Sequence, residues 1–67
     1  MAKVVKVIEV LSQSDKSWED AAQNAITEAS KSIKNIKSIY IEEKSAKVTG
    51  NKISKYRITA KISFVIG

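Results

Sequence analysis

The side chains that could carry chemistry in this chain are nearly all charged. Its 67 residues include no histidine and no cysteine, so the familiar pairs of a nucleophile and a general base are missing. The same absence removes the Cys and His ligands of a structural zinc site and the partners of a disulfide. Serine and lysine are too common here for any pair of them to indicate catalysis. We therefore expect a binding protein and not an enzyme.

Basic residues alternate along a segment near the end of the chain. Lys55, Arg57 and Lys61 are separated by even numbers of residues, so in a β-strand their side chains share one face. Such a stripe suits an anion site, repeated by symmetry around a cavity. It is equally typical of a polar sheet face in water. The pattern leaves open whether the stripe lines a cavity or faces solvent.

Two adjacent acids, Glu42 and Glu43, fall in another predicted strand. Neighbouring strand residues point to opposite faces, so we expect that one subunit cannot use both carboxylates on one ion. Calcium takes about six to eight oxygen ligands, so a calcium site here would draw on symmetry mates or water. The sequence therefore does not define the ligands of such a calcium site.

The first element that positions these groups is a β-strand over Lys3–Leu11, which is rich in β-branched residues. Both of its faces are mostly apolar, which predicts that both are covered. A single helix covers only one face, so a neighbouring subunit is expected on the other. One face carries Val4, Lys6, Ile8 and Val10, and the other carries Val5, Val7, Glu9 and Leu11.

The second element is an amphipathic helix from about Trp18 to about Ile33. Ser17 followed by Asp20 is a capping pattern at its start, and Lys31 and Lys34 suit the negative end of the helix dipole. Asn35 is the expected terminating residue. Spacings of three and four define an apolar stripe rich in alanine, which predicts close packing. The stripe contains residues 18, 21, 22, 25, 26, 29, 33 and 36.

Two further strands, Ser38–Val48 and Ile53–Ile66, flank a turn at Thr49-Gly50-Asn51-Lys52. Gly50 at the first central position favours a type II′ hairpin turn. The second strand places Ile39 and Ile41 on one face and Ser38, Tyr40 and Glu42 on the other. The third strand alternates most clearly. Its apolar side is Tyr56, Ile58, Ala60, Ile62, Phe64 and Ile66.

These elements predict an α+β fold of β-α-β-β order in a single domain over residues 1–67. A strand–helix–strand unit runs its two strands parallel, with a right-handed crossover, and the hairpin makes the third strand antiparallel to the second. Placing the third strand in the middle makes every pairing antiparallel. We expect a three-stranded antiparallel sheet of order 1-3-2, curled around one helix.

Size and charge bear on partners. A domain this small supplies only about 3–5 kcal/mol from its core and usually needs a staple, so self-association is favoured. No apolar run is long enough for a membrane span or a signal peptide, and we expect a cytoplasmic location with no membrane partner. The formal charge of +5 is spread along the chain with acids between the lysines, which makes nucleic acid an unlikely partner.

The sequence resembles the dodecin family over nearly its whole length. Order, length and combination carry the resemblance more than any single motif. The matching residues are Lys3-Val4-Val5-Lys6-Val7-Ile8-Glu9, Ser17-Trp18, Ala21-Ala22, Asn24-Ala25, Ala29-Ser30, Ile33-Lys34-Asn35-Ile36, Tyr56 and Lys61-Ile62-Ser63-Phe64.

The resemblance implies a hollow homododecamer that binds FMN or riboflavin between subunits and stores it without catalysis. In typical members a tryptophan stacks on the flavin ring and a glutamine hydrogen-bonds its edge; Ser38 and Arg57 stand at those positions. Glu43 matches an acidic position near the ligand pocket. Tyr40, two residues from Ser38 on the same face, is a substitute stacking surface. The alternative is a flavin-free shell that is structural or binds ions such as calcium, as a calcium-binding subset does.

Overall fold

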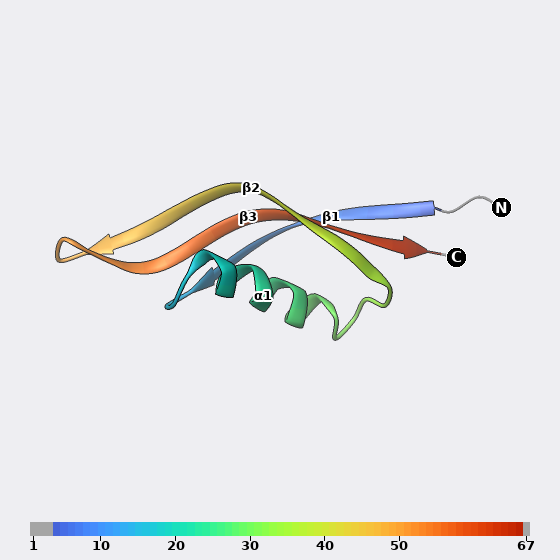
Figure 1. The fold of residues 1–67 in the computed structure, drawn as a ribbon, viewed down its shortest axis with the longest axis horizontal. Helices are drawn as coiled ribbons and strands as arrows, with labels where there is room; N and C mark the ends of the chain where they lie inside the picture. The colour runs from blue at the N-terminus through green and yellow to red at the C-terminus, as the bar shows by residue number, and fades with distance from the viewer. Residues whose placement is uncertain (1–3, 67) are drawn as a thin grey trace.

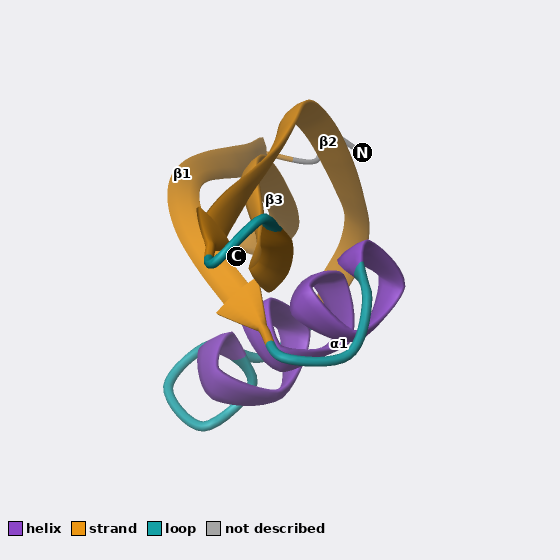
Figure 2. Ribbon diagram, turned by 90° about the vertical axis from the view of Figure 1, so that its left-hand side faces the viewer, coloured by secondary structure: helices purple, strands orange, loops and turns teal. Residues whose placement is uncertain are grey.

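The computed structural model describes residues 4–66 as one sheet and one helix. The elements are β1 (Val4–Ser14), α1 (Trp18–Ala29), β2 (Ile36–Thr49) and β3 (Lys52–Ile66). The sheet order is β1-β3-β2 with both pairings antiparallel, as predicted. Figure 1 shows α1 lying across one face of a long, twisted sheet, and Figure 2 shows the sheet curling around it. The molecule is elongated, with extents of 54 × 20 × 13 Å.

The core lies between α1 and the centre of β3. Ile58 and Ile62 are the largest fully buried side chains, and Ala60 and Phe64 are buried beside them. Ala21 and Ala25 are the buried residues of the helix. Their short side chains let the helix backbone approach the sheet closely, which was the expectation from the alanine stripe. The alternation in β3 thus buries one side of the central strand under the helix.

β1 continues three residues beyond the predicted end at Leu11, to Ser14. The extra residues, Ser12, Gln13 and Ser14, are all polar. They stay in the strand because their hydroxyls bond to the helix: Ser12 Oγ donates to the carbonyl of Ala21 at 2.7 Å, and Ser14 Oγ donates to Asp20 at 2.5 Å. The prediction for Lys3 lies outside the described residues.

α1 ends at Ala29 and not at Ile33 as predicted. After Ala29 the backbone tightens, because Lys31 N–H bonds to Glu28 and Ser32 N–H to Ala29, three residues back. Ser30 Oγ also donates to the carbonyl of Thr27 at 2.8 Å, which competes for the last helical carbonyls. No basic residue falls in the last turn.

The residues that flank α1 agree with the predictions at one end of the helix and differ at the other. Asn35 does take a left-handed backbone, with φ of 64°, but it lies in the loop six residues after the helix ends. Ser17 caps the other end as expected, accepting from the N–H of Asp20 at 2.9 Å.

The hairpin turn is type I′ and not type II′. Gly50 has φ of 58° and Asn51 has φ of 63°, so both central residues are left-handed. Asparagine tolerates this conformation better than other non-glycine residues, which explains how the second position reaches it. Figure 1 shows the β2–β3 hairpin extending beyond the N-terminal end of α1.

β2 also contains an irregularity that the sequence did not indicate. Its register with β3 shifts between Ile41 and Glu43, so Glu42 is an extra residue opposite the central strand. Within residues 4–66 no helix is long and apolar enough to cross a membrane.

Candidate binding face of the sheet

The face of the sheet turned away from α1 carries the predicted site residues in a series of cross-strand rows. We call it the open face. Residues paired directly across antiparallel strands share a face, so the register defines its members. From one end to the other the rows, ordered β1–β3–β2, are Val7–Ser63–Ser38, Glu9–Lys61–Tyr40, Leu11–Thr59–Glu43 and Gln13–Arg57–Ser45.

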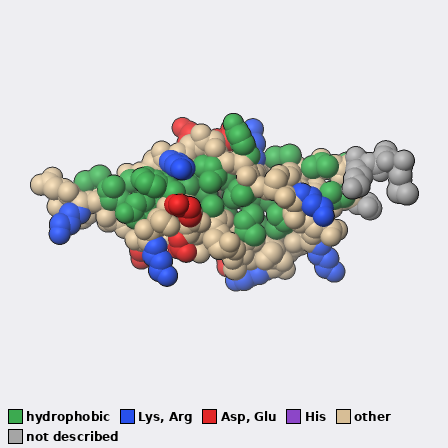
Figure 3. All heavy atoms as spheres, viewed as in Figure 1, with side chains coloured by type: hydrophobic (Ala, Val, Ile, Leu, Met, Phe, Trp, Pro, Cys, Tyr) green, Lys and Arg blue, Asp and Glu red, His purple; other side chains and the backbone are tan. Residues whose placement is uncertain are grey.

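Large apolar side chains lie uncovered on the open face. Leu11 is 81% exposed, Tyr40 67%, and Val5 and Val7 53% each. Figure 3 shows hydrophobic side chains at the surface along much of the molecule, with lysine and arginine between them. As predicted, α1 covers only one face of β1; the cover expected on the other face, a neighbouring subunit, stays a prediction. The second face has no cover within the described chain.

Two of the three cations of the predicted basic stripe are paired with acids. Lys55 pairs with Asp15, and Lys61 Nζ lies 3.6 Å from Glu42. Arg57 has no ion-pair partner among residues 4–66. Its direct neighbours across the sheet are neutral, with Gln13 on β1 and Ser45 on β2. The predicted basic stripe therefore reduces to one free guanidinium.

Arg57 lies at a pocket of about 530 Å³ on this face. Leu11 supplies an apolar wall, while Gln13, Ser45 and Thr59 supply groups that both donate and accept hydrogen bonds. The sequence pointed to Arg57 alone, because the lining residues become its neighbours only through the sheet register. The pocket is lined by Leu11, Ser12, Gln13, Ser45, Arg57, Ile58 and Thr59.

The bulge changes the expected placement of the two acids. Glu42 was predicted to point away from Glu43, but its carboxylate lies 3.6 Å from Lys61, whose row belongs to the open face. Glu43 belongs to the same face, opposite Thr59. Both carboxylates are therefore available on one side of the sheet. In the described part of the chain, no three acidic side chains gather closely enough to hold a metal ion by themselves.

The four predicted site residues divide into two groups. Arg57 and Glu43 lie in adjacent rows at one end, while Ser38 and Tyr40 lie toward the other. Ser38 Oγ is 2.5 Å from Ser63 Oγ, and Ser63 is six residues from Arg57 along β3. At about 3.3 Å per residue, this spacing places Ser38 roughly 20 Å from Arg57. A small ligand that contacts both positions must lie between two copies of the chain.

Trp18 supports the pocket from the helix side. Its Nε1 donates to the main-chain carbonyl of Ser45 at 3.0 Å, and its ring meets Tyr56 edge-on at 4.9 Å between centroids. Lys44 Nζ lies 5.9 Å from the centre of the indole. The residue is half-buried in these contacts, so it anchors the start of α1 against β2 and β3.

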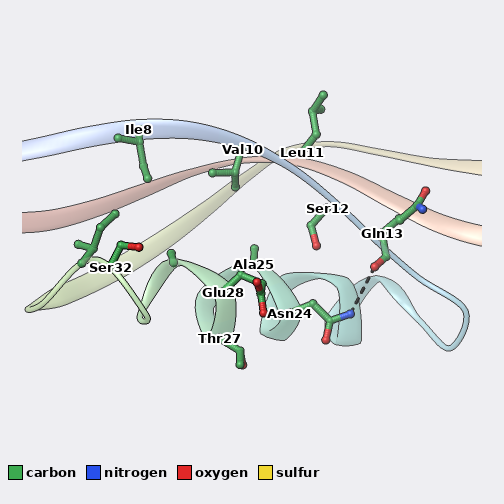
Figure 4. Close-up of a pocket in the computed structure, with 12 residues that line it drawn as sticks. Ile8, Val10, Leu11, Ser12, Gln13, Asn24, Ala25, Thr27, Glu28 and Ser32 are labelled. Carbon is green, nitrogen blue, oxygen red and sulfur yellow. Dashed lines mark hydrogen bonds between the residues drawn. The ribbon is translucent and has the colours of Figure 1, made fainter.

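A second hollow of about 670 Å³ runs between β1 and α1 (Figure 4). Ile8, Val10 and Ala25 line it on the apolar side, and Asn24 bonds across it to the carbonyl of Gln13 at 3.3 Å. It follows the outer edge of β1, whose backbone groups have no strand partner on that side within the described residues. An uncovered strand edge of this kind favours contact with another chain.

The comparisons with known proteins agree with this architecture. The family model described as Dodecin matches residues 4–67. A dodecin of T. thermophilus, solved as an arginine-to-alanine mutant, is 21% identical with a TM-score of 0.94, covering 98% of each chain. The dodecin from Streptomyces davaonensis is 19% identical with a TM-score of 0.94, covering 100% of this chain and 98% of its own.

A third structure is more similar in sequence. It is the calcium-chelating immunodominant antigen, calcium dodecin, from Mycobacterium tuberculosis, described as having a novel calcium-binding site. The identity is 35%, the TM-score is 0.82, and the match covers 96% of this chain and 91% of that one. No curated protein matches the chain. The chain belongs to the dodecin family.

Proposed function

We propose that this protein is a non-enzymatic binding and storage shell, a hollow homododecamer that holds a small ligand at its subunit interfaces. The observation that carries the proposal is the open face, where Leu11, Val7 and Tyr40 are more than half exposed. Apolar area left in water costs about 25 cal/mol per Å², so covering it with a second copy is favourable. The separation of Ser38 from Arg57 supports a ligand site shared between copies.

In this proposal, the affinity for the family ligands FMN and riboflavin is reduced. Ser38 has no aromatic face, and stacking is the main attraction that a flavin ring offers to a side chain. Tyr40, one row away and 67% exposed, is the available aromatic surface. We therefore propose that flavin binds weakly here and that the physiological ligand is another small molecule.

The experiment for this proposal combines the mass of the protein in solution with a flavin titration. A dodecamer of 7.4 kDa subunits is expected by light scattering after size exclusion. Flavin fluorescence should fall only at high protein concentration, without a sharp stoichiometric end point. A monomer at micromolar concentration would contradict the shell, and tight stoichiometric quenching would contradict the weakened flavin site.

Calcium is the second candidate, and two observations favour it. The relative from M. tuberculosis is described as a calcium dodecin at 35% identity. In this chain the bulge leaves the carboxylates of Glu42 and Glu43 on the same face. Because calcium takes about six to eight oxygens, the remaining ligands would come from a second copy and from water.

Calorimetry with calcium chloride tests this candidate directly. Binding should release or absorb measurable heat and raise the melting temperature of the wild-type protein, and the double variant Glu42→Gln, Glu43→Gln should do neither. The matched control is Glu19→Gln, which removes an exposed carboxylate from the first turn of α1. A wild-type protein with no heat and no shift in melting temperature would remove calcium from consideration.

A further inference from the structure

We propose that the pocket around Arg57 is an anion site, selective for small molecules that join a carboxylate or phosphate to an apolar body. The inference rests on the proposed function, because a ligand held at this exposed face is completed by a second subunit. It goes further by assigning the chemical class of that ligand. Three features of the pocket carry it: an uncompensated charge, a donor-only side chain and an adjoining apolar wall.

The first feature is the charge. Lys55 and Lys61, which flank Arg57 on the same face of β3, are each paired with an acid. Arg57 has neutral neighbours on both sides, Gln13 and Ser45, and no acid within ion-pair distance in the described chain. Among the three cations of the predicted stripe, Arg57 is therefore the one whose charge is not neutralised by an acid of residues 4–66.

The second feature is the chemistry of guanidinium. Arginine offers five N–H donors in a planar fork and accepts no hydrogen bond, so it matches the paired oxygens of a carboxylate or phosphate. An amide or imide presents both donors and acceptors along one edge. Its N–H donor would face the N–H donors of the guanidinium and find no acceptor there, so such a ligand fits the site less well. The hydroxyls of Ser45 and Thr59 adapt to the remaining oxygen atoms of an anion, because each can donate.

The third feature is the wall. Leu11 lines the same pocket and is 81% exposed, so an apolar group beside the anion would take this surface out of water. Glu43 does not line the pocket but lies in the adjacent row, opposite Thr59 on the same face of the sheet. The negative charge of Glu43 should push the anionic group of the ligand away from the Thr59 row and toward Gln13 in the Arg57 row. The apolar part of the ligand then lies over Leu11 in the Thr59 row.

The chain contains a single arginine, which makes the test specific. Phenylglyoxal reacts with guanidinium groups, so the mass of the proteolytic peptide that contains Arg57, taken after modification of the full chain, reports modification of this residue. Benzoate and phenyl phosphate at millimolar concentration should slow this modification several-fold, and the neutral analogue benzamide should not. Equal rates in all four conditions, including no addition, would overturn the anion site. Slowing by phenyl phosphate alone would narrow the class to phosphates.

Calorimetry with the same probes covers the case in which assembly shields Arg57 from the reagent. Arg57→Gln should weaken benzoate or phenyl phosphate about 10-fold, the loss expected for hydrogen bonds to a charged group. Lys55→Gln removes the same charge two residues away on the same face but loses only a pair with Asp15, and should change affinity less than about 3-fold. Equal losses in both variants would indicate general attraction to a basic face and would overturn the assignment.

The outcomes separate this inference from the proposed function. A dodecamer in which Arg57→Gln binds both anions as the wild type does would keep the shell and reject the anion site. A monomer whose Arg57 is protected by benzoate would reject the shell and keep the anion site. In a Glu43→Gln variant, anion affinity should rise about 2- to 3-fold, because one repulsive charge in the adjacent row is removed.

Discussion

The indole nitrogen of Trp18 donates a hydrogen bond of 3.0 Å to the main-chain carbonyl of Ser45, which lies 27 residues further along the chain. The contact joins the first turn of α1 to β2 at the row that contains Arg57. The helix thereby fixes the backbone on one side of the pocket. A contact on the helix side of the sheet therefore holds the backbone of a residue that lines the pocket on the open face.

Replacing Trp18 tests this connection. Trp18→Phe keeps an aromatic ring against Tyr56 and loses the hydrogen bond, so we expect a loss of about 1 kcal/mol in the free energy of unfolding. Trp18→Ala should cost more, on the order of 2–3 kcal/mol, because a half-buried ring is also removed. Urea unfolding at a fixed protein concentration measures both, since self-association adds to apparent stability. Wild-type stability in Trp18→Phe would contradict a structural hydrogen bond.

A charge on the apolar part of the open face should disrupt self-association. In Leu11→Lys a cation replaces a leucine that is 81% exposed, so the subunit itself should fold normally. We expect the mass in solution to fall while the far-ultraviolet circular dichroism stays unchanged. The control is Gln23→Lys, which adds the same charge to an exposed position of α1. An unchanged mass for Leu11→Lys would show that this face stays in water.

Adding an aromatic ring at Ser38 should restore flavin affinity. Ser38→Trp places an indole on the open face, in the row beside Tyr40. Stacking of an aromatic side chain on a heterocyclic ring contributes about 1–3 kcal/mol, so riboflavin should bind roughly 10-fold more tightly or better. Ser38→Leu is the control because it adds apolar area without a π face. Titrations followed by flavin fluorescence measure the affinity of both variants. A similar gain in riboflavin affinity in Ser38→Trp and Ser38→Leu would show that missing apolar area, and not missing stacking, weakens the site.

The hairpin turn gives a matched pair of substitutions. Gly50→Ala places a side chain on a residue with φ of 58°, and no atom lies within 4 Å of the new Cβ, so only the backbone conformation resists it. We expect a loss of about 1 kcal/mol in the free energy of unfolding. Asn51→Gly, at φ of 63°, should cost nothing or stabilise slightly. If chemical unfolding gave Gly50→Ala a free energy of unfolding equal to or higher than that of Asn51→Gly, the type I′ turn would be contradicted.

The order of the strands was predictable because it depends on hydrophobic periodicity. β3 alternates so regularly that its buried side, including Ile58 and Ile62, and its central place were both predicted correctly. The end of the helix was not, because it depends on the bond from Ser30 Oγ to the carbonyl of Thr27. The length of β1 was not predictable either, since Ser12 and Ser14 stay in the strand through acceptors on the helix.

The candidate site was predictable only in part. Alternation placed Ser38 and Tyr40 together on one face of β2 and Arg57 on the polar side of β3, and the register joins these three on the open face. Glu43 was expected on the opposite face. The bulge at Glu42 carries no local signal, so the prediction that the two acids oppose each other was wrong. The distance between Ser38 and Arg57 also requires the register. Whether these four residues bind a ligand stays a prediction.

The strand order has a consequence for how the chain reaches its fold during synthesis. β3 is the last of the three strands to leave the ribosome, yet it is the only one that pairs with the other two. Until it emerges, β1 and β2 have no hydrogen-bonding strand partner within the described chain, and α1 lacks Ile58 and Ala60, the residues of β3 that form the buried cluster with Ala21. The sheet cannot be built stepwise from the N-terminal side. Each nascent chain completes its sheet in one late event, and only then can it meet another copy.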